Sequence, residues 1–198
     1  FFVGAGVPTE AYAALLRHLA ARGFLVVALI CPGNLSYKCS SDVDVMPVLG
    51  QYNDIVNGNW FTSGHSLGGG VASDWAFLHQ DIIKGVLLFA GSTTSDFAAT
   101  GSSMEFMQIY GSLDAYDGAP ASRYIDDYLL PFVDPQHLHS RCIEGASHYT
   151  WGYYGYQPPF YPAIISRQQQ ISEGVDAAAE WILSITADTL QRSVRIAF

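Results

Sequence analysis

Short apolar runs alternate along this chain with stretches of helical periodicity. The apolar runs predict six β-strands, at residues 1–3, 24–30, 60–63, 85–90, 105–110 and 140–144. Several of them are continuous rather than alternating, which is typical of strands covered on both faces of a parallel sheet. The first run opens the chain abruptly, so we expect either a minimal fold or strands that precede Phe1.

The clearest helix is the last one, where apolar residues recur at helical spacing at Ile171, Val175, Ala178, Ile182 and Ile185. A first helix is expected to begin at the cap Thr9 and to end at Gly23, with an apolar stripe made of Tyr12, Leu15, Leu16 and Leu19. Further helices are expected over residues 41–56, interrupted by Pro47, and over residues 71–78. Strands alternating with helices predict an α/β fold, with one doubly wound, mainly parallel sheet of about six strands in a single domain, residues 1–198.

Ligands of such sheets bind outside the carboxyl ends of the strands, so reactive side chains just after a strand become candidates. Residues 64–68 read Gly-His-Ser-Leu-Gly, which fits the Gly-x-Ser-x-Gly pattern, and they stand between a predicted strand and a predicted helix. A sharp turn there exposes the hydroxyl of Ser66 at a helix N-terminus, where developing negative charge is favoured. The alternative is a glycine-rich turn with Ser66 as a simple helix cap.

A serine hydroxyl needs a base, and in this arrangement an acid and then a histidine follow it in the chain. Three histidines come late enough, but His137 and His139 precede the last predicted strand and stand at its wrong end. His148 follows that strand directly, so we expect it to be the general base. A solvated surface histidine is the alternative.

The orienting acid is predicted to be Asp114, which comes directly after the strand at 105–110. Asp96 is the runner-up and Asp117 is a third candidate, while a turn or cap role is the alternative for each. Backbone N–H groups of Leu67 and Ala5 are expected to form the oxyanion hole.

Seven aromatic residues crowd positions 149–161. Tyr149, Trp151 and Tyr153, together with His65, are predicted to line an apolar or aromatic substrate pocket. A loop packed on its own aromatic side chains is an equal alternative. Only a short connection joins the strands at 85–90 and 105–110, so we expect an open site without a lid.

Charge and composition exclude several classes of function. Nine basic residues against eighteen acidic ones give a net charge of −9, and no basic cluster occurs that could bind nucleic acid. The sequence contains no run of eighteen apolar residues, so no transmembrane helix is predicted, and no secretory leader opens the chain. The compartment and the oligomeric state stay open.

Three cysteines argue against a full disulfide framework. Cys31 and Cys39 could pair across a short loop, or all three thiols could be free. His137, His139 and Cys142 lack the spacing of a known metal motif, so neither a metal nor an organic cofactor is expected.

Together these segments resemble the α/β-hydrolase superfamily, and more narrowly its small, lidless branch of dienelactone-hydrolase-like serine esterases. The resemblance rests on the opening turn at residues 2–12, the elbow at 64–69, the segment 110–114, and above all residues 144–148 followed by the aromatic-glycine segment 152–157. A dienelactone hydrolase proper has a cysteine nucleophile where this chain has Ser66. The resemblance therefore implies an esterase acting on a small-molecule ester, and not that specific reaction.

The predicted function is hydrolysis of carboxylic esters through an acyl-enzyme on Ser66. An acyltransferase or a lyase with the same three residues is the alternative within this machinery. A non-catalytic binding protein on a hydrolase scaffold is the alternative of another class.

Overall fold

A four-stranded parallel sheet forms the centre of the protein, as the computed structural model describes it for residues 1–56, 58–115 and 119–194, with side chains of the last helix up to Ala187. The strands lie in the order β1-β2-β3-β4, and their bounds are Trp60–His65, Ile83–Phe89, Glu105–Gly111 and Leu138–Ile143. All three strand pairs are parallel. The carboxyl ends of the strands therefore meet at one edge of the sheet, and the loops that leave this edge carry the candidate residues.

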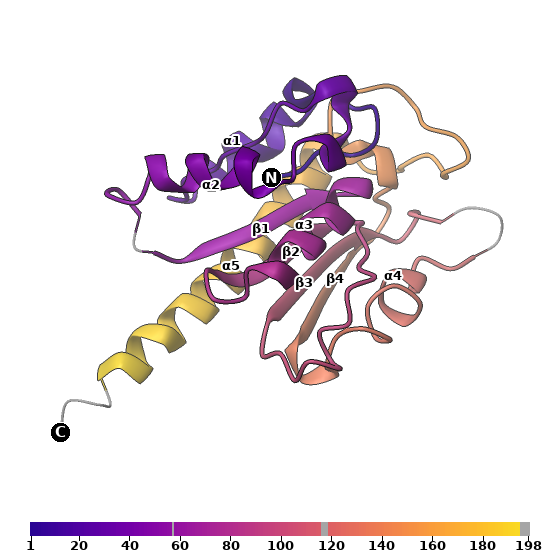
Figure 1. Ribbon diagram of the computed structural model, residues 1–198. Helices are drawn as coiled ribbons and strands as arrows, with labels where there is room; N and C mark the ends of the chain where they lie inside the picture. Colours follow the sequence, from indigo (N-terminus) through magenta and orange to yellow (C-terminus); the bar gives the residue numbers. More distant parts are fainter. Residues whose placement is uncertain (57, 116–118, 195–198) are drawn as a thin grey trace.

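Helices cover both faces of the sheet (Figure 1). On one face, α1 (Ala13–Ala20) and α5 (Arg167–Val194) pack with Leu87 and Phe89 of β2. On the other face, α3 (Leu67–Leu78) packs with Val86 and Leu88. Successive β2 residues thus enter opposite cores, which explains why this strand is a continuous apolar run. The doubly wound α/β fold predicted from the sequence is confirmed.

The remaining helical elements lie in the connections. The ten-residue helix α2 (Asp42–Gln51) lies before β1. The one-turn helix α4 (Arg123–Asp126) lies between β3 and β4. Five short 3-10 helices complete the described elements: η1 (Thr9–Tyr12), η2 (Pro32–Asn34), η3 (Ser36–Lys38), η4 (Pro135–His137) and η5 (His148–Trp151). Residues 90–104, between β2 and β3, contain turns and no helix, as expected for an open site.

Two of the six predicted strands are absent from the described part of the chain. At residues 1–3, only Phe2 bridges to Gly64, and residues 24–30 form no strand. The Leu29 N–H does reach the carbonyl oxygen of Phe1 at 3.4 Å, so the two segments lie side by side. Phe24 and Val26 are half-buried against the α1–α5 core, whereas Leu25 and Ile30 are exposed, so this apolar run does not mark a strand of the sheet.

Two helix boundaries also differ from prediction. Thr9 does not cap the first helix, because its hydroxyl donates to the carbonyl oxygen of Leu29 at 3.0 Å. The helix expected to reach residue 56 ends at Gln51, although Pro47 is accommodated inside it. The C-terminal stripe is confirmed, since four of its five residues are buried and Ile185 packs against them.

No helix among the described residues combines the length and the apolar character that a membrane span needs.

Candidate active site

The turn between β1 and α3 holds Ser66 in a backbone conformation that a non-glycine residue seldom adopts. Its φ is 54° and its ψ is −123°. Its N–H donates to the carbonyl oxygen of Phe89 at 3.1 Å, and its own carbonyl accepts the Gly69 N–H at 2.9 Å. These bonds hold a conformation that costs free energy, and such strain concentrates at functional sites. The side chain of Ser66 consequently stands at the N-terminus of α3, where the helix dipole favours negative charge.

Gly64 and Gly68, on either side of Ser66, have no room for a side chain. A Cβ atom on Gly64 would lie 2.1 Å from the carbonyl oxygen of Gly68. A Cβ atom on Gly68 would in turn lie 2.2 Å from the carbonyl oxygen of Phe2. Both clashes are with backbone, which cannot move aside as a side chain can. The close approach also keeps residues 2–5 against the turn, because Phe2 bonds to Ser63 and His65 on either side of Gly64.

His148 and Asp114 meet in a buried pair at the carboxyl ends of β4 and β3. Nδ1 of His148 lies 3.0 Å from Oδ1 of Asp114, and the two residues are 3% and 1% exposed. A carboxylate at this distance fixes the ring tautomer, with the proton on Nδ1 and the lone pair on Nε2. The pair can therefore take up and stabilise a proton.

Tyr124, which the sequence analysis missed, completes this pair. Its hydroxyl donates to Oδ1 of Asp114 at 2.8 Å and lies 3.1 Å from Nδ1 of His148. Burial and the neighbouring carboxylate of Asp114 raise the pKa of Tyr124 well above its ordinary value, so it stays a neutral donor. Oδ2 of Asp114 is buried without a hydrogen-bond partner among the described residues. Nothing in the sequence signals this contact, because it depends on how the connection between β3 and β4 folds back.

The backbone before His148 is held by a glutamine from α5. Gln170 is fully buried, and its amide accepts the Ser147 N–H at 3.1 Å and donates to the Ser147 carbonyl at 2.9 Å. The imidazole itself stacks on Phe160, with ring centroids 3.9 Å apart and planes 8° from parallel. The ring of His148 is thus fixed through its edge, its face and its preceding peptide. A polar Gln170 beside Ile171 of the apolar stripe was the available sequence signal.

The turn after Phe2 lies beside the elbow. The Gly4 N–H donates to the Tyr12 hydroxyl at 3.1 Å, and the Gly6 N–H donates to the Asn34 carbonyl at 2.9 Å. No hydrogen bond of the described residues engages the Ala5 N–H between them. Leu67 is the first residue of α3, where the N–H has no partner within the helix. The Leu67 N–H directly follows Ser66, and Ala5 lies in the turn after Phe2, whose backbone bonds to Ser63 and His65. An oxyanion hole made of these two amides stays a prediction.

The structure joins only part of the predicted set directly. Among the hydrogen bonds of the described residues, none connects the Ser66 hydroxyl to His148. The two are neighbours through the elbow, since the ring of His65 lies 4.7 Å from that of His148 and its Nε2 lies 3.0 Å from the His148 carbonyl oxygen.

A family model described as "Alpha/beta hydrolase family" matches residues 1–172. The chain belongs to the alpha/beta hydrolase family. None of the curated proteins has a significant sequence match to it.

Solved structures of other alpha/beta hydrolases superpose on this one at low sequence identity. An S-formylglutathione hydrolase of Agrobacterium tumefaciens is 16% identical with a TM-score of 0.59, over 91% of this chain and 80% of its own. A carboxylesterase of the thaumarchaeon Nitrososphaera gargenis is 14% identical with a TM-score of 0.61, over 94% and 90%. Est1E of Butyrivibrio proteoclasticus, which was solved with ferulic acid bound, is 13% identical with a TM-score of 0.61, over 94% and 88%. At these identities the likeness is one of fold.

Two residues predicted to line a substrate pocket of this hydrolase do not do so. Trp151 is fully buried in the core, with its ring centroid 4.9 Å from that of Phe89. His65 is 1% exposed and both of its ring nitrogens have hydrogen-bond partners. A pocket wall has to be accessible, so these predictions are wrong. Tyr149 is half-buried and Tyr153 is exposed, and a pocket role for both stays a prediction.

The other candidates for acid and base that the structure describes have other partners. Asp96 is exposed and its carboxylate accepts the Ala99 N–H at 2.9 Å, as a turn aspartate does. Asp117 lies outside the described residues. His137 and His139 both contact the carboxylate of Glu105, at 2.9 and 3.0 Å, near the amino ends of β3 and β4.

Cys31 and Cys39, whose pairing the sequence left open, form a disulfide. Their short loop carries Asn34, whose carbonyl holds the Gly6 N–H. Cys142 is a free, exposed thiol. Among the described residues, no group of three or more His, Cys, Asp or Glu side chains could hold a metal ion.

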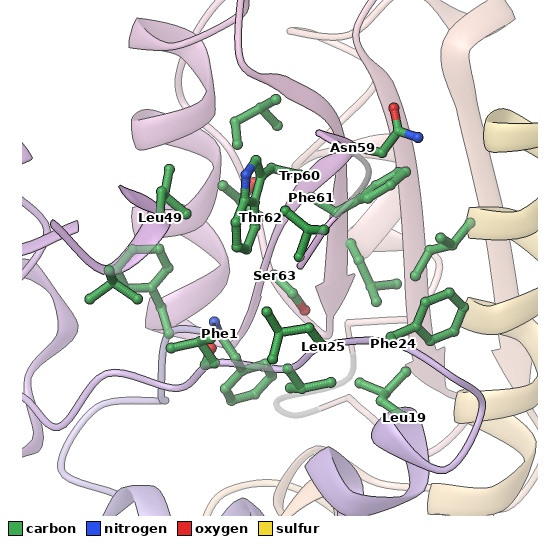
Figure 2. A pocket seen from close by; sticks show the side chains of 18 of the residues that line it. Phe1, Leu19, Phe24, Leu25, Leu49, Asn59, Trp60, Phe61, Thr62 and Ser63 are labelled. Atoms are coloured by element: carbon green, nitrogen blue, oxygen red, sulfur yellow. Dashed lines mark hydrogen bonds between the residues drawn. The ribbon is translucent and has the colours of Figure 1, made fainter. Parts of the chain in front are cut away.

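A cavity of about 530 Å³ lies away from these residues, along β1 (Figure 2). Its lining includes Trp60, Phe61 and Thr62 of β1 and, facing them, Phe24 and Leu25. Ser66, Asp114 and His148 are not part of the lining. The cavity is largely apolar because most of the side chains that line it are aliphatic or aromatic.

Proposed function

We propose that this protein hydrolyses carboxylic esters through an acyl-enzyme on Ser66, with His148 as general base and Asp114 as orienting acid. One observation carries the proposal. A serine in strained backbone geometry at a helix N-terminus directly follows His65, whose ring lies 4.7 Å from that of His148 in the buried carboxylate–imidazole pair. Neither a turn nor a helix cap requires that combination, whereas nucleophilic acyl transfer does.

The first half of the reaction acylates the serine. Asp114 accepts a hydrogen bond from Nδ1–H of His148, so the Nε2 lone pair is free to take the proton of Ser66. We expect the contact between the Ser66 hydroxyl and Nε2 to close when substrate is bound, because such contacts are often long in a free enzyme. The oxygen of Ser66 attacks the ester carbonyl, and imidazolium then protonates the leaving alcohol.

The second half releases the acid and regenerates the serine. Water gives a proton to His148 and attacks the acyl-enzyme carbonyl, after which Ser66 leaves and recovers that proton. In both halves the oxyanion is held by the backbone N–H groups of Leu67 and Ala5. Support for Ala5 comes from elimination, since the N–H groups of Gly4 and Gly6 are already bonded to Tyr12 and Asn34.

The substrate is proposed to be a small ester with an apolar or aromatic acyl group. Phe160 stacks on His148, and Tyr149 and Tyr156 pack edge to face with centroids 5.2 Å apart. These rings place aromatic surface around the reacting group, where an apolar acyl chain gains by burial. Residues 90–104 contain no helix that could form a lid, and water is the acceptor that we expect for the acyl group.

Hydrolysis of p-nitrophenyl esters of increasing chain length tests the proposal. Ser66→Ala and His148→Ala should each lower kcat by about 10⁴-fold or more, as removal of a member of such a triad does. Ser95→Ala, on the loop between β2 and β3, is the matched control and should keep full activity. Equal activity of Ser66→Ala and Ser95→Ala would refute the assignment of the nucleophile.

A fluorophosphonate label and product analysis separate the alternatives. A binding protein on this scaffold would leave Ser66 unlabelled. An acyltransferase would be labelled but would give mainly the transfer product when an alcohol or amine competes with water. We expect labelling at Ser66 and the free acid as the main product.

A further inference from the structure

A buried chain of hydrogen bonds connects the turn at Gly4 to the backbone of His148. The Gly4 N–H donates to the Tyr12 hydroxyl at 3.1 Å, and this hydroxyl lies 2.8 Å from Nδ1 of His65. On the other side of the ring, Nε2 of His65 lies 3.0 Å from the carbonyl oxygen of His148. Tyr12 and His65 are 0% and 1% exposed, so water does not compete for these bonds.

The donors and acceptors of this chain fit in only one way with a neutral ring. A carbonyl oxygen only accepts, so Nε2 of His65 must carry the proton and Nδ1 must be the acceptor. The Tyr12 hydroxyl then donates to Nδ1 while it accepts from Gly4. Burial, with the nearby His148 as a second cause, lowers the pKa of His65 well below its ordinary value, which agrees with a neutral ring. All four polar groups are satisfied in this arrangement.

The two ends of the chain lie where the proposed mechanism is most sensitive to position. At one end is the His148 peptide, from which the general base projects. At the other end is the Gly4 N–H, and the next amide in the chain is that of Ala5. A Cβ atom on Gly4 would lie 2.9 Å from both the His65 ring and the Tyr12 oxygen, so the Gly4 backbone packs closely against both side chains. One buried ring thereby joins two separate loops, the turn at Gly4 and the loop of His148.

We propose that His65 and Tyr12 are positioning residues that hold the general base and the oxyanion turn in a fixed relation across the elbow. The inference rests on the proposed function of Ser66, His148 and the Ala5 amide. The His148 carbonyl fixes the tautomer of His65, and the Tyr12 hydroxyl donates to the Nδ1 that this tautomer leaves as an acceptor. Loss of either bond frees one end of the chain, so the transition state is stabilised less while binding of the substrate changes little.

Two substitutions of His65 separate the halves of the chain. In His65→Gln the side-chain amide reaches as far as Nε2 and can still donate to the His148 carbonyl. In His65→Asn the shorter amide replaces only Nδ1, so the bond to His148 is lost. His79→Asn is the matched control, because His79 bonds to Asp42 at the far end of α3.

With p-nitrophenyl esters, His65→Asn should lower kcat about 10- to 100-fold, the range in which second-layer contacts act, with KM within about twofold. His65→Gln should recover most of that loss, and His79→Asn should match the wild type. Tyr12→Phe should lower kcat about 10-fold, and the double variant Tyr12→Phe/His65→Asn should be no slower than His65→Asn alone, because both act through one chain.

Nitrogen NMR of the histidine rings gives a readout that needs no turnover. Wild-type His65 should be the neutral Nε2–H tautomer at pH 7, and Tyr12→Phe should keep this tautomer while the Nδ1 resonance moves, because Nδ1 has lost its hydrogen bond. An inactive and unlabelled wild type would overturn the proposed function and, with it, this inference. If the wild type is active, four results overturn the inference alone. Three are kinetic: His65→Asn has the same kcat as His79→Asn, His65→Gln recovers none of the loss in kcat, or the losses of Tyr12→Phe and His65→Asn add in the double variant. The fourth is an Nδ1–H tautomer of His65 in the wild type.

Discussion

At the scale of the residue, the elbow glycines are fixed by backbone contact. Gly64→Ala puts a Cβ atom 2.1 Å from the Gly68 carbonyl oxygen, and it should lower the free energy of unfolding by about 3 kcal/mol or more. Gly70→Ala is the matched control, because its Cβ atom would lie 3.9 Å from the nearest atom, the Ser92 oxygen. Inside α3 that alanine should stabilise by roughly 0.5–1 kcal/mol. Urea unfolding measures both, and equal midpoints would contradict the steric argument.

A second prediction at this scale concerns pH. In the folded protein the pKa of His65 lies well below 6.5, its ordinary value, so the ring stays neutral at a pH somewhat below 6.5. In the unfolded chain the same ring takes up a proton there, so the unfolded chain binds more protons than the folded one. Stability should therefore fall as the pH is lowered from 6.5, by up to about 1.4 kcal/mol per pH unit from this residue. Three groups face His65: Tyr12 and Tyr154, which are neutral in this range, and His148. All three are present both in the wild type and in a variant that lacks His65.

His65→Gln removes this titration. Its free energy of unfolding should therefore fall less steeply than that of the wild type between pH 6.5 and 5. Urea unfolding at several pH values measures the two slopes. Parallel slopes would mean that His65 is protonated in the folded protein.

At the scale of the element, α5 does more than cover the sheet. Gln170→Leu leaves the Ser147 N–H without a partner and removes one donor to the Ser147 carbonyl, which keeps the Thr150 hydroxyl, so it should cost about 1–3 kcal/mol. It should also lower kcat, because His148 follows directly. Gln169→Leu makes the same change at an exposed position one residue away, and it should shift stability by no more than about 0.5 kcal/mol. Thermal unfolding and ester hydrolysis should separate the pair, and matching behaviour would argue against the Gln170 clamp.

At the scale of the whole molecule, the aromatic segment after His148 divides between core and surface. Trp151→Ala should cost about 3–5 kcal/mol, because its fully buried ring packs on Phe89 and against Gly174 of α5. Tyr153→Ala should cost at most about 1 kcal/mol, since Tyr153 is 58% exposed and its main contact is the guanidinium of Arg167, 4.7 Å away.

Denaturation and steady-state kinetics distinguish these two roles. If either substitution changes KM, we expect it to be Tyr153→Ala and not Trp151→Ala. A Trp151→Ala protein that unfolds like the wild type and loses only substrate affinity would restore Trp151 to the pocket.

Much of the fold could be predicted from local pattern. The strands after residue 60, the stripe of α5 and the turn at Ser66 follow from periodicity and from glycine spacing, which depend on neighbours in the chain. The segments at 1–3 and 24–30 could not be predicted this way. Their apolar residues form continuous runs as a buried strand would, but pairing depends on backbone partners that an apolar run does not specify, and Leu25 and Ile30 are exposed.

The same limit applies to the candidate site. The order of residues along the chain, with the strand ends, was enough to predict Asp114 and His148 as partners, and their side chains do meet at 3.0 Å. The sequence by itself determined which reactive groups stand at the carboxyl edge of the sheet, because that edge follows from strand direction. Only the tertiary structure decided that Tyr124 bonds to Asp114, that Gln170 holds Ser147, and that His65 is buried in a hydrogen-bonded chain rather than facing a pocket. Those contacts join residues far apart in the chain, and their geometry is set by packing of the whole molecule rather than by any local pattern.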